Sequence, residues 1–170
     1  MAATNNKLGL VSSAAITTTG IASMATSSTL TAGWSYAEID NTTNLYLDYW
    51  ISGKNTVGTT PTANTVIETW IIPKREDSSY HDTFDGTNKA VTVTSRAMLR
   101  AYGFLLRSMD VDVATSDRGY EFNGGVWRTC DFFTPLKFQV FITHNTGVNL
   151  NSTAGNHVAY QKGVYTTSGG

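Results

Sequence analysis

The sequence predicts an all-β fold, an antiparallel β-sandwich that is jelly-roll-like, with about eight strands and an extended N-terminal arm. Stretches rich in β-branched and aromatic residues recur along the 170-residue chain, and several alternate between apolar and polar residues. Turn signals built from Gly, Pro, Asn and Asp separate these stretches. No segment has the spacing of a long amphipathic helix. Many short strands joined by such turns are typical of sandwiches and barrels.

We expect one domain, residues 16–170, with an N-terminal arm of residues 1–15 in front of it. A chain of 170 residues, 41% of them hydrophobic, is long enough for one core. The arm is assigned because its residues are small and polar and show little periodicity. It is not expected to be a signal peptide, since Thr17, Thr18 and Thr19 make the stretch too polar for an export core.

The two clearest strands lie at residues 45–51 and 66–72, the second of which ends at Pro73. Period 2 with aromatic enrichment is typical of a half-buried antiparallel strand. One face of the first strand carries Leu45, Leu47, Tyr49 and Ile51. Further strands are expected at residues 16–24, 34–39, 89–94, 104–113, 136–144 and 157–167, with another strand and a corner within 120–133.

A short helix or bend is predicted at residues 95–101. Ser95 is placed to cap it, and Met98 and Leu99 are expected to face inward.

Residues 74–88 hold the densest charge of the chain and are expected to form a long exposed loop. The Asp85-Gly86 pair is a turn signal that closes it. Because long loops in compact domains are often functional, this loop is a candidate contact surface. The alternative is a solvated excursion without a partner.

The composition predicts a surface of hydroxyls and amides. Charged residues make up 15% of the chain, and 12 Lys and Arg balance 13 Asp and Glu, whereas ordinary soluble domains carry about 25% charged residues. This pattern indicates a surface covered by neighbouring chains, or simply the preference of Thr for strands. The near-neutral charge argues against nucleic acid as a partner. No apolar run reaches the roughly 18–20 residues that span a membrane, so no membrane partner is expected.

No catalytic, cofactor-binding or metal site is predicted, and the chain is not expected to be an enzyme. His144 and His157 flank one loop and could meet across paired strands, with His81 or Asp131 nearby only by an accident of the fold. Two imidazoles alone make a weak zinc site. We therefore interpret the histidines as hydrogen-bonded loop residues.

The carboxylates also suggest no site. Asp110 and Asp112 share one strand face and are interpreted as edge-strand charges that deter aggregation, with a calcium site as the alternative. Glu38, Glu68 and Glu121 lie in strand-like stretches. Nothing in the sequence orients two of them as the pair that a glycosidase needs.

The tryptophans and the cysteine are assigned mainly to packing. Trp34, Trp50, Trp70 and Trp127 could stack on sugars, but three of the four lie in alternating strand patterns, which favours the core or a contact between subunits. The single Cys130 cannot form an intrachain disulfide and is interpreted as a small buried apolar residue.

Two separated segments resemble small virion proteins of tailed bacteriophages. The first reads Asp-Asn-Thr-Thr-Asn-Leu-Tyr-Leu-Asp-Tyr over residues 40–49. The second reads Phe-Ile-Thr-His-Asn-Thr-Gly-Val over residues 141–148 and is followed by Gly155, Asn156 and His157. The order of the sequence between them is also similar, so the resemblance covers most of residues 34–166. The charged loop and the arm match less well.

The resemblance implies a structural protein of a phage virion, in its most direct form a capsid decoration (cement) protein. Such a protein binds the shell of the major capsid protein and bridges its subunits. Copies of the chain are expected to associate as a trimer or dimer on the capsid surface, after synthesis in the cytoplasm of the host bacterium. No catalytic residues follow from the resemblance. The alternatives are a receptor- or glycan-binding module of a phage head or tail fibre and, third, a small glycoside-active enzyme.

Overall fold

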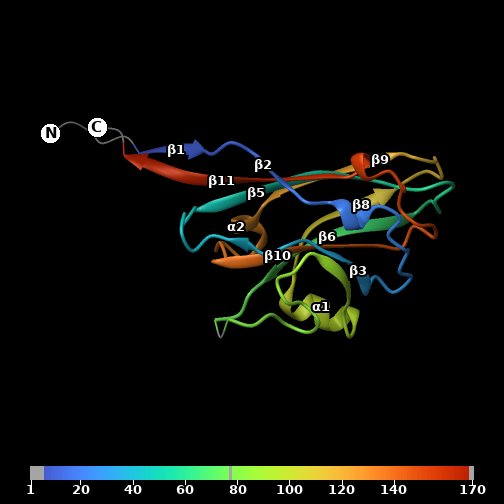
Figure 1. The fold of residues 1–170 in the computed structure, drawn as a ribbon, viewed down its shortest axis with the longest axis horizontal. Coiled ribbons are helices and arrows are strands. Elements are labelled where there is room, and N and C mark those ends of the chain that lie inside the picture. Colours follow the sequence, from blue (N-terminus) through green and yellow to red (C-terminus); the bar gives the residue numbers. More distant parts are fainter. Residues whose placement is uncertain (1–5, 77, 169–170) are drawn as a thin grey trace.

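The computed structural model describes residues 6–76 and 78–168, which form two antiparallel β-sheets packed face to face (Figure 1). Sheet A contains β1 (Asn6–Leu10), β2 (Ala14–Ile16), β5 (Asp48–Thr56), β9 (Gly119–Gly125) and β11 (Val158–Ser168). Sheet B contains β3 (Ala32–Ser35), β4 (Ile39–Asp40), β6 (Thr65–Pro73), β7 (Lys89–Thr92), β8 (Phe104–Val111) and β10 (Lys137–His144). The helical segments are η1 (Thr19–Ile21), α1 (Arg96–Tyr102), α2 (Val126–Thr129) and η2 (Ala154–Asn156).

The pairing order makes this sandwich a jelly roll. In sheet A, β11 lies between β2 and β5, and β9 pairs with the other side of β5. In sheet B the order is β3, β10, β6, β8. When these strands are counted along the chain, the first pairs with the eighth and the second with the seventh, which is the double Greek key of a jelly roll. The predicted fold is therefore confirmed, with β1, β4 and β7 as additional strands.

The predicted N-terminal arm is part of sheet A. Within the described residues, β1 pairs with the end of β11 and β2 pairs with its beginning, while residues 1–5 lie outside them. The strand expected at residues 16–24 is wrong beyond Ile16, because the chain turns into η1. Gly20 permits this turn, since a Cβ there would overlap the indole of Trp34. The turn carries Ile21 into the core.

The space between the sheets holds the main core. Its large members include Tyr36, Ile51, Ile67, Phe122, Phe138 and Ile142, all fully buried or nearly so. Residues of β5, β9, β6 and β10 thus supply side chains from both sheets, as the alternating pattern of a sandwich requires.

The outer face of sheet B is also covered, which the sequence did not predict. The segment 74–103, which is described except for residue 77, folds back across it before and after β7, and α1 lies on the side of sheet B away from sheet A (Figure 1). Tyr80, Phe84 and Leu99 from this segment pack with Trp70 and Phe141 of the sheet in a second apolar cluster. The described residues of 74–88 form a loop, as predicted, but it is not exposed throughout, because Tyr80 and Phe84 are buried.

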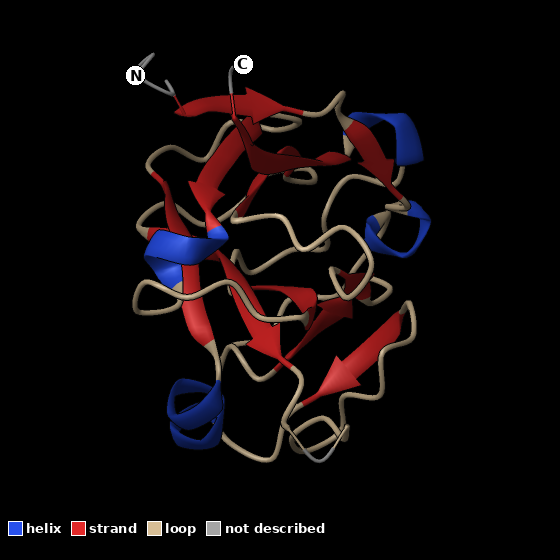
Figure 2. Ribbon diagram, turned by 90° about the vertical axis from the view of Figure 1, so that its left-hand side faces the viewer, coloured by secondary structure: helices blue, strands red, loops and turns tan. Residues whose placement is uncertain are grey.

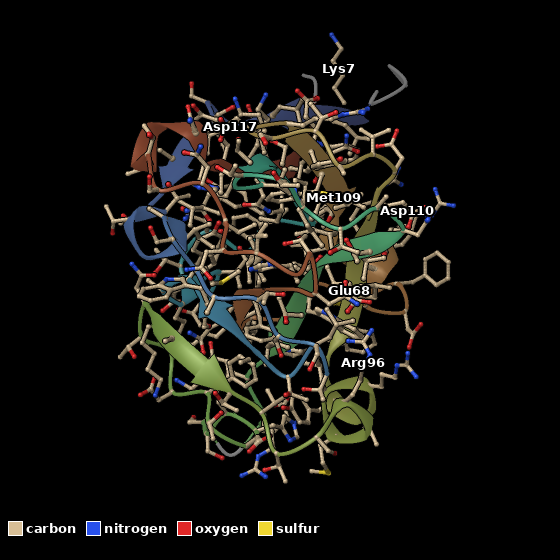
Figure 3. The ribbon with its side chains drawn as sticks, turned by 90° about the vertical axis from the view of Figure 1, so that its right-hand side faces the viewer. Lys7, Glu68, Arg96, Met109, Asp110 and Asp117 are labelled. Carbon is tan, nitrogen blue, oxygen red and sulfur yellow. The ribbon has the colours of Figure 1, made fainter. Side chains whose placement is uncertain are left out.

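Helix α1 forms where it was predicted. The hydroxyl oxygen of Ser95 accepts a hydrogen bond from the backbone N–H of Met98 at 3.1 Å, which is an N-cap. Leu99 faces inward as expected, whereas Met98 is exposed. Arg96 pairs with the buried Glu68 of β6, and the two lie side by side in Figure 3.

Candidate interaction surface

The loops of the sandwich gather at two opposite ends with different surfaces. Figure 2 faces the end at which α2 lies, and Figure 3 faces the opposite end, where Asp117 is labelled. The apolar end, as we call it, is formed by residues 41–47 between β4 and β5 and residues 126–136 between β9 and β10. The polar end is formed by residues 17–31, 57–64, 112–118 and 145–157.

Large apolar side chains are exposed at the apolar end. They are Leu45, Leu47, Trp127, Phe132, Phe133 and Leu136. Within the described residues of the polar end, Val113 is the single large apolar side chain that is exposed. Exposed apolar side chains gathered at one end of a domain are typical of a contact site for another protein.

Direct contacts join the two loops of the apolar end into one surface. The hydroxyl of Thr134 donates to the carbonyl oxygen of Leu47 at 2.6 Å. The backbone N–H of Asn41 donates to the carbonyl oxygen of Leu136 at 2.7 Å. The two loops are therefore held next to each other at this end of the sandwich.

The carboxylate of Asp48 holds the start of α2 against β5. It accepts the backbone N–H of Trp127 at 2.6 Å, and burial raises its pKa although hydrogen bonds to the carboxylate oppose this rise. Gly125 leaves room for this contact, because a Cβ there would lie 2.7 Å from an oxygen of Asp48. Beyond α2, the ring of Phe132 packs edge-on against that of Trp127, with centroids 5.0 Å apart.

The loop at residues 41–47 is held by one buried side chain. Asn41 donates from Nδ2 to the carbonyl oxygen of Tyr46 at 2.9 Å and accepts the N–H of Tyr46 at 2.8 Å. The two bonds close a ring around residues 42–45. Leu45 is therefore presented at a defined position instead of on a free loop.

Two of the exposed apolar residues at the apolar end have unusual backbone angles. Leu45 has φ of 50° and Phe132 has φ of 68°, the left-handed region that disfavours residues with a Cβ. Their side chains are 64% and 67% exposed. Leu30 has a similar φ of 56°, but its side chain is buried in the chain's own interior. For Leu45 and Phe132 no burial within the chain offsets the strain, so both are presented outward at a cost in stability of about 1–2 kcal/mol each.

A charged network borders the apolar end. Glu38 accepts hydrogen bonds from Lys74 at 3.0 Å and from the hydroxyl of Tyr80 at 3.1 Å, and Lys137 lies 3.3 Å away. Burial favours the neutral form of Glu38, but these partners outweigh it and lower its pKa. Lys137 also pairs with Asp40 at 2.8 Å. The charges are thus balanced inside the network, which fixes the start of segment 74–103 beside the apolar loops.

The polar end satisfies its own hydrogen-bonding groups. His144 is fully buried, with Nε2 3.2 Å from the carbonyl oxygen of Met24 and Nδ1 2.9 Å from the hydroxyl of Thr146. Burial lowers the pKa of His144 to about 4. His157 lies 2.9 Å from the carbonyl oxygen of Asn151, and burial lowers its pKa too.

The interpretation of these two histidines as hydrogen-bonded residues is confirmed. His81 lies elsewhere, stacked on the ring of Tyr102 with centroids 4.9 Å apart. Across residues 6–76 and 78–168, no three His, Cys, Asp or Glu side chains are grouped so as to hold a metal ion.

The carboxylates considered from the sequence lie apart, each with its own surroundings. Glu38 is in the network described above, Glu68 is buried against Arg96 and Trp70, and Glu121 is exposed on β9 of the other sheet. Asp110 lies on β8, the last strand of sheet B, and it is exposed (Figure 3).

Asp112 follows β8 and pairs with Arg118 at 3.3 Å. Asp110 lies on the edge strand β8 and Asp112 lies just beyond it. Both positions agree with the interpretation that these charges deter aggregation at the edge of the sheet.

The tryptophans divide between core and surface. Trp70 is buried, and Trp34 is half-buried with its indole N–H donating to Asn88 at 2.6 Å. Trp50 and Trp127 are exposed. Cys130 is fully buried, as predicted, and burial raises the pKa of its thiol to about 12.

Sequence reasoning missed most residues of the apolar end. Leu45 and Leu47 were placed on one face of a half-buried strand at residues 45–51, but β5 begins at Asp48. Phe132 and Phe133 were included in a strand and corner, but α2 and a loop take their place. The turn cluster at residues 40–43 was the available signal, because it indicates that regular pairing starts later.

No protein-family model matches this chain, and no curated protein matches it either. Every helix within the described residues is too short or too polar to cross a membrane.

Proposed function

We propose that this chain is a structural protein of a tailed-phage virion, a capsid decoration (cement) protein without catalytic activity. It binds the shell of the major capsid protein through the apolar end and bridges neighbouring subunits. The observation that carries the proposal is the exposed apolar surface of loops 41–47 and 126–136, in which Leu45 and Phe132 are presented with left-handed backbone angles. The resemblance of residues 40–49 and 141–148 to small phage virion proteins supplies the kind of partner.

The residue types exposed at the apolar end suit such a contact. Burying one large apolar side chain contributes about 1.5–3 kcal/mol, and six of them are exposed here. Stable protein interfaces bury roughly 1,200–2,000 Å² in total, with aromatic residues at the centre. Trp127, Phe132 and Phe133 supply those aromatic residues. Many copies on one shell would add their contacts, so that even a modest single contact reinforces the lattice.

The stiffness of the jelly roll supports the mechanical role. A bridge resists separation of two subunits only if its own shape does not change under load. Both faces of sheet B are packed, by the main core and by segment 74–103. The apolar loops are tied to this rigid body by Asn41 and Asp48. The polar end, rich in hydroxyls and amides, then faces the solvent.

The test uses virions made without this chain. Such particles should lose resistance to heat or chelators, and purified wild-type protein should restore it. The Trp127→Ser/Phe132→Ser double variant should fail to restore it, whereas Glu121→Gln, an exposed change on β9, should restore it fully. Particles that keep their full resistance without the protein would refute the cement role. The copy number per virion, expected in the hundreds, separates a shell component from a tail part.

The exposed aromatic residues favour one second candidate, a receptor- or glycan-binding module. Trp127 and Phe132 lie together on a loop surface, and aromatic faces of this kind can stack on sugar rings. Glycan-array binding that disappears in a Trp127→Ser variant would support this second function. A handful of copies per virion would support it as well.

A further inference from the structure

Strand β1 leaves an open edge on sheet A. The order in this sheet is β1, β11, β5, β9, so one side of β1 has no neighbour within the described residues. Together, β1 and the end of β11 extend past the rest of the sandwich as a two-stranded ribbon (Figure 1). Two strands alone are marginally stable in water, so a ribbon of this kind gains from an additional strand.

The hydrogen-bonding pattern shows which groups face the open edge. The N–H of Val11 donates to the carbonyl oxygen of Gly163 at 3.1 Å. Hydrogen-bonded pairs alternate along an antiparallel ladder, so Gly9 and Lys7 face β11. The N–H and C=O groups of Leu8 and Leu10 therefore point toward the open edge.

The side chains of the same two residues are also exposed. Leu8 is 73% exposed and Leu10 is 61% exposed, and they share one face of β1 because the period of a strand is two. Gly9 is on the other face, where the ring of Tyr165 leaves no room for a Cβ. Monomeric proteins usually protect such edges with charges, Pro or bulges. Within its described side chains, β1 has only Lys7 for this purpose.

We propose that β1 pairs antiparallel with β1 of a second copy of this chain, which joins two sandwiches through a continuous four-stranded ribbon. Leu8 then lies opposite Leu10 of the second copy, and the outward N–H and C=O groups of both residues form the new ladder. This inference rests on β1 and β11 alone and does not depend on the proposed function.

The sequence of β1 favours this register. In this register the two-fold axis of the dimer passes between the two copies of Gly9. They form a non-hydrogen-bonded pair, in which the Cα atoms of opposite residues are closest, at about 4.5 Å. The four leucines form one apolar cluster across the joint. Lys7 lies opposite Val11 of the second copy, so no like charges meet, whereas a shift by two residues in each strand would place Lys7 against itself. Because the strands run antiparallel, the two sandwich bodies lie at opposite ends of the ribbon.

Sedimentation velocity of the full chain over a range of concentrations tests the proposal. The wild-type protein should be a dimer, and the Leu8→Pro variant should be a monomer with unchanged thermal stability. Proline at this position removes an N–H that faces the open edge, while the bonds of Lys7 and Gly9 to β11 remain. The Phe132→Ser variant, altered at the apolar end, should stay dimeric. A monomeric wild type would overturn the proposal, and so would a dimer that Phe132→Ser dissociates and Leu8→Pro does not.

Cross-linking gives an independent readout that does not require the proline variant to fold. In a Leu8→Cys variant, a short bis-maleimide should link two chains, because the two introduced thiols lie on the same face of neighbouring strands. A Glu121→Cys variant, changed on β9 at the other edge of sheet A, should give no link. The native Cys130 is buried and does not compete. Equal cross-linking of both variants would contradict the proposed pairing.

Discussion

The two ends of the sandwich connect the same strands but differ in how much apolar surface their loops expose. At the polar end, buried histidines are hydrogen-bonded to neighbouring loops, as His144 is to the carbonyl oxygen of Met24 and to the hydroxyl of Thr146. At the apolar end, the loops are equally well fixed, by Asn41 and Asp48, yet their large apolar side chains remain exposed. Loops that are fixed in position but keep large apolar side chains exposed indicate a surface that contacts another molecule. The loops of the polar end expose little apolar surface and do not indicate such a contact.

The largest expected effect lies at the polar end. The His144→Ala change removes a fully buried ring together with its contacts to Thr146 and to the carbonyl oxygen of Met24, which keeps only the N–H of Leu150 at 3.0 Å. We expect the free energy of unfolding to fall by about 3–5 kcal/mol, measured by urea denaturation. The matched change at the apolar end, Phe132→Ser, should alter it by less than about 1 kcal/mol. Equal losses at both ends would remove the distinction between them.

The second-largest expected effect is a loss of stability in acid, caused by the buried histidines of the polar end. The pKa of His144 is lowered to about 4 from an ordinary value of about 6.5 in the unfolded chain. The unfolded state therefore binds the proton first, and stability falls as the pH drops from about 6.5 toward 4, by about 3 kcal/mol from this group. His157, whose pKa is also lowered, adds to the same trend.

Urea denaturation at a series of pH values measures this dependence. A His144→Gln variant, which has no titrating group at this position, should lose less stability over the same pH range than the wild type. A wild-type stability that stays constant between pH 6.5 and 4 would show that the buried histidines do not remain neutral in the folded protein.

A smaller effect of opposite sign is expected at the apolar end. Leu45 has a left-handed backbone and an exposed side chain. The Leu45→Gly change relieves the strain, although it also frees the unfolded chain, so the melting temperature should stay equal or rise by about 2–4 °C. The same variant should bind phage shells less well. Calorimetry and a shell-binding assay measure the two effects, and a marked loss of stability would show that Leu45 serves the fold.

The sequence predicted the sandwich well because its central strands carry strong patterns. The strands expected at residues 66–72 and 136–144 match β6 and β10 closely. These strands are buried on both faces, and runs of β-branched and aromatic residues mark them clearly. Ser95 predicted the start of α1 because an N-cap is a local signal.

The candidate site was harder to predict because its residues look like core residues. The alternation of Leu45, Leu47 and Tyr49 continues through the point where β5 begins, so periodicity alone places all three inside. Tertiary contacts decide otherwise, since Asn41 closes the loop around Leu45. Likewise, Tyr80 and Phe84 occur in a highly charged segment, and only the fold shows that they cover sheet B.

Hydrogen exchange of the protein in purified virions, compared with the free protein, tests the central claim most directly. If another protein covers the apolar end, backbone amides of residues 41–47 and 126–136 should exchange markedly more slowly in the virion, while residues 145–157 at the polar end should exchange at unchanged rates. Protection at the polar end with unchanged exchange at residues 126–136 would contradict the assignment of the apolar end as the contact surface.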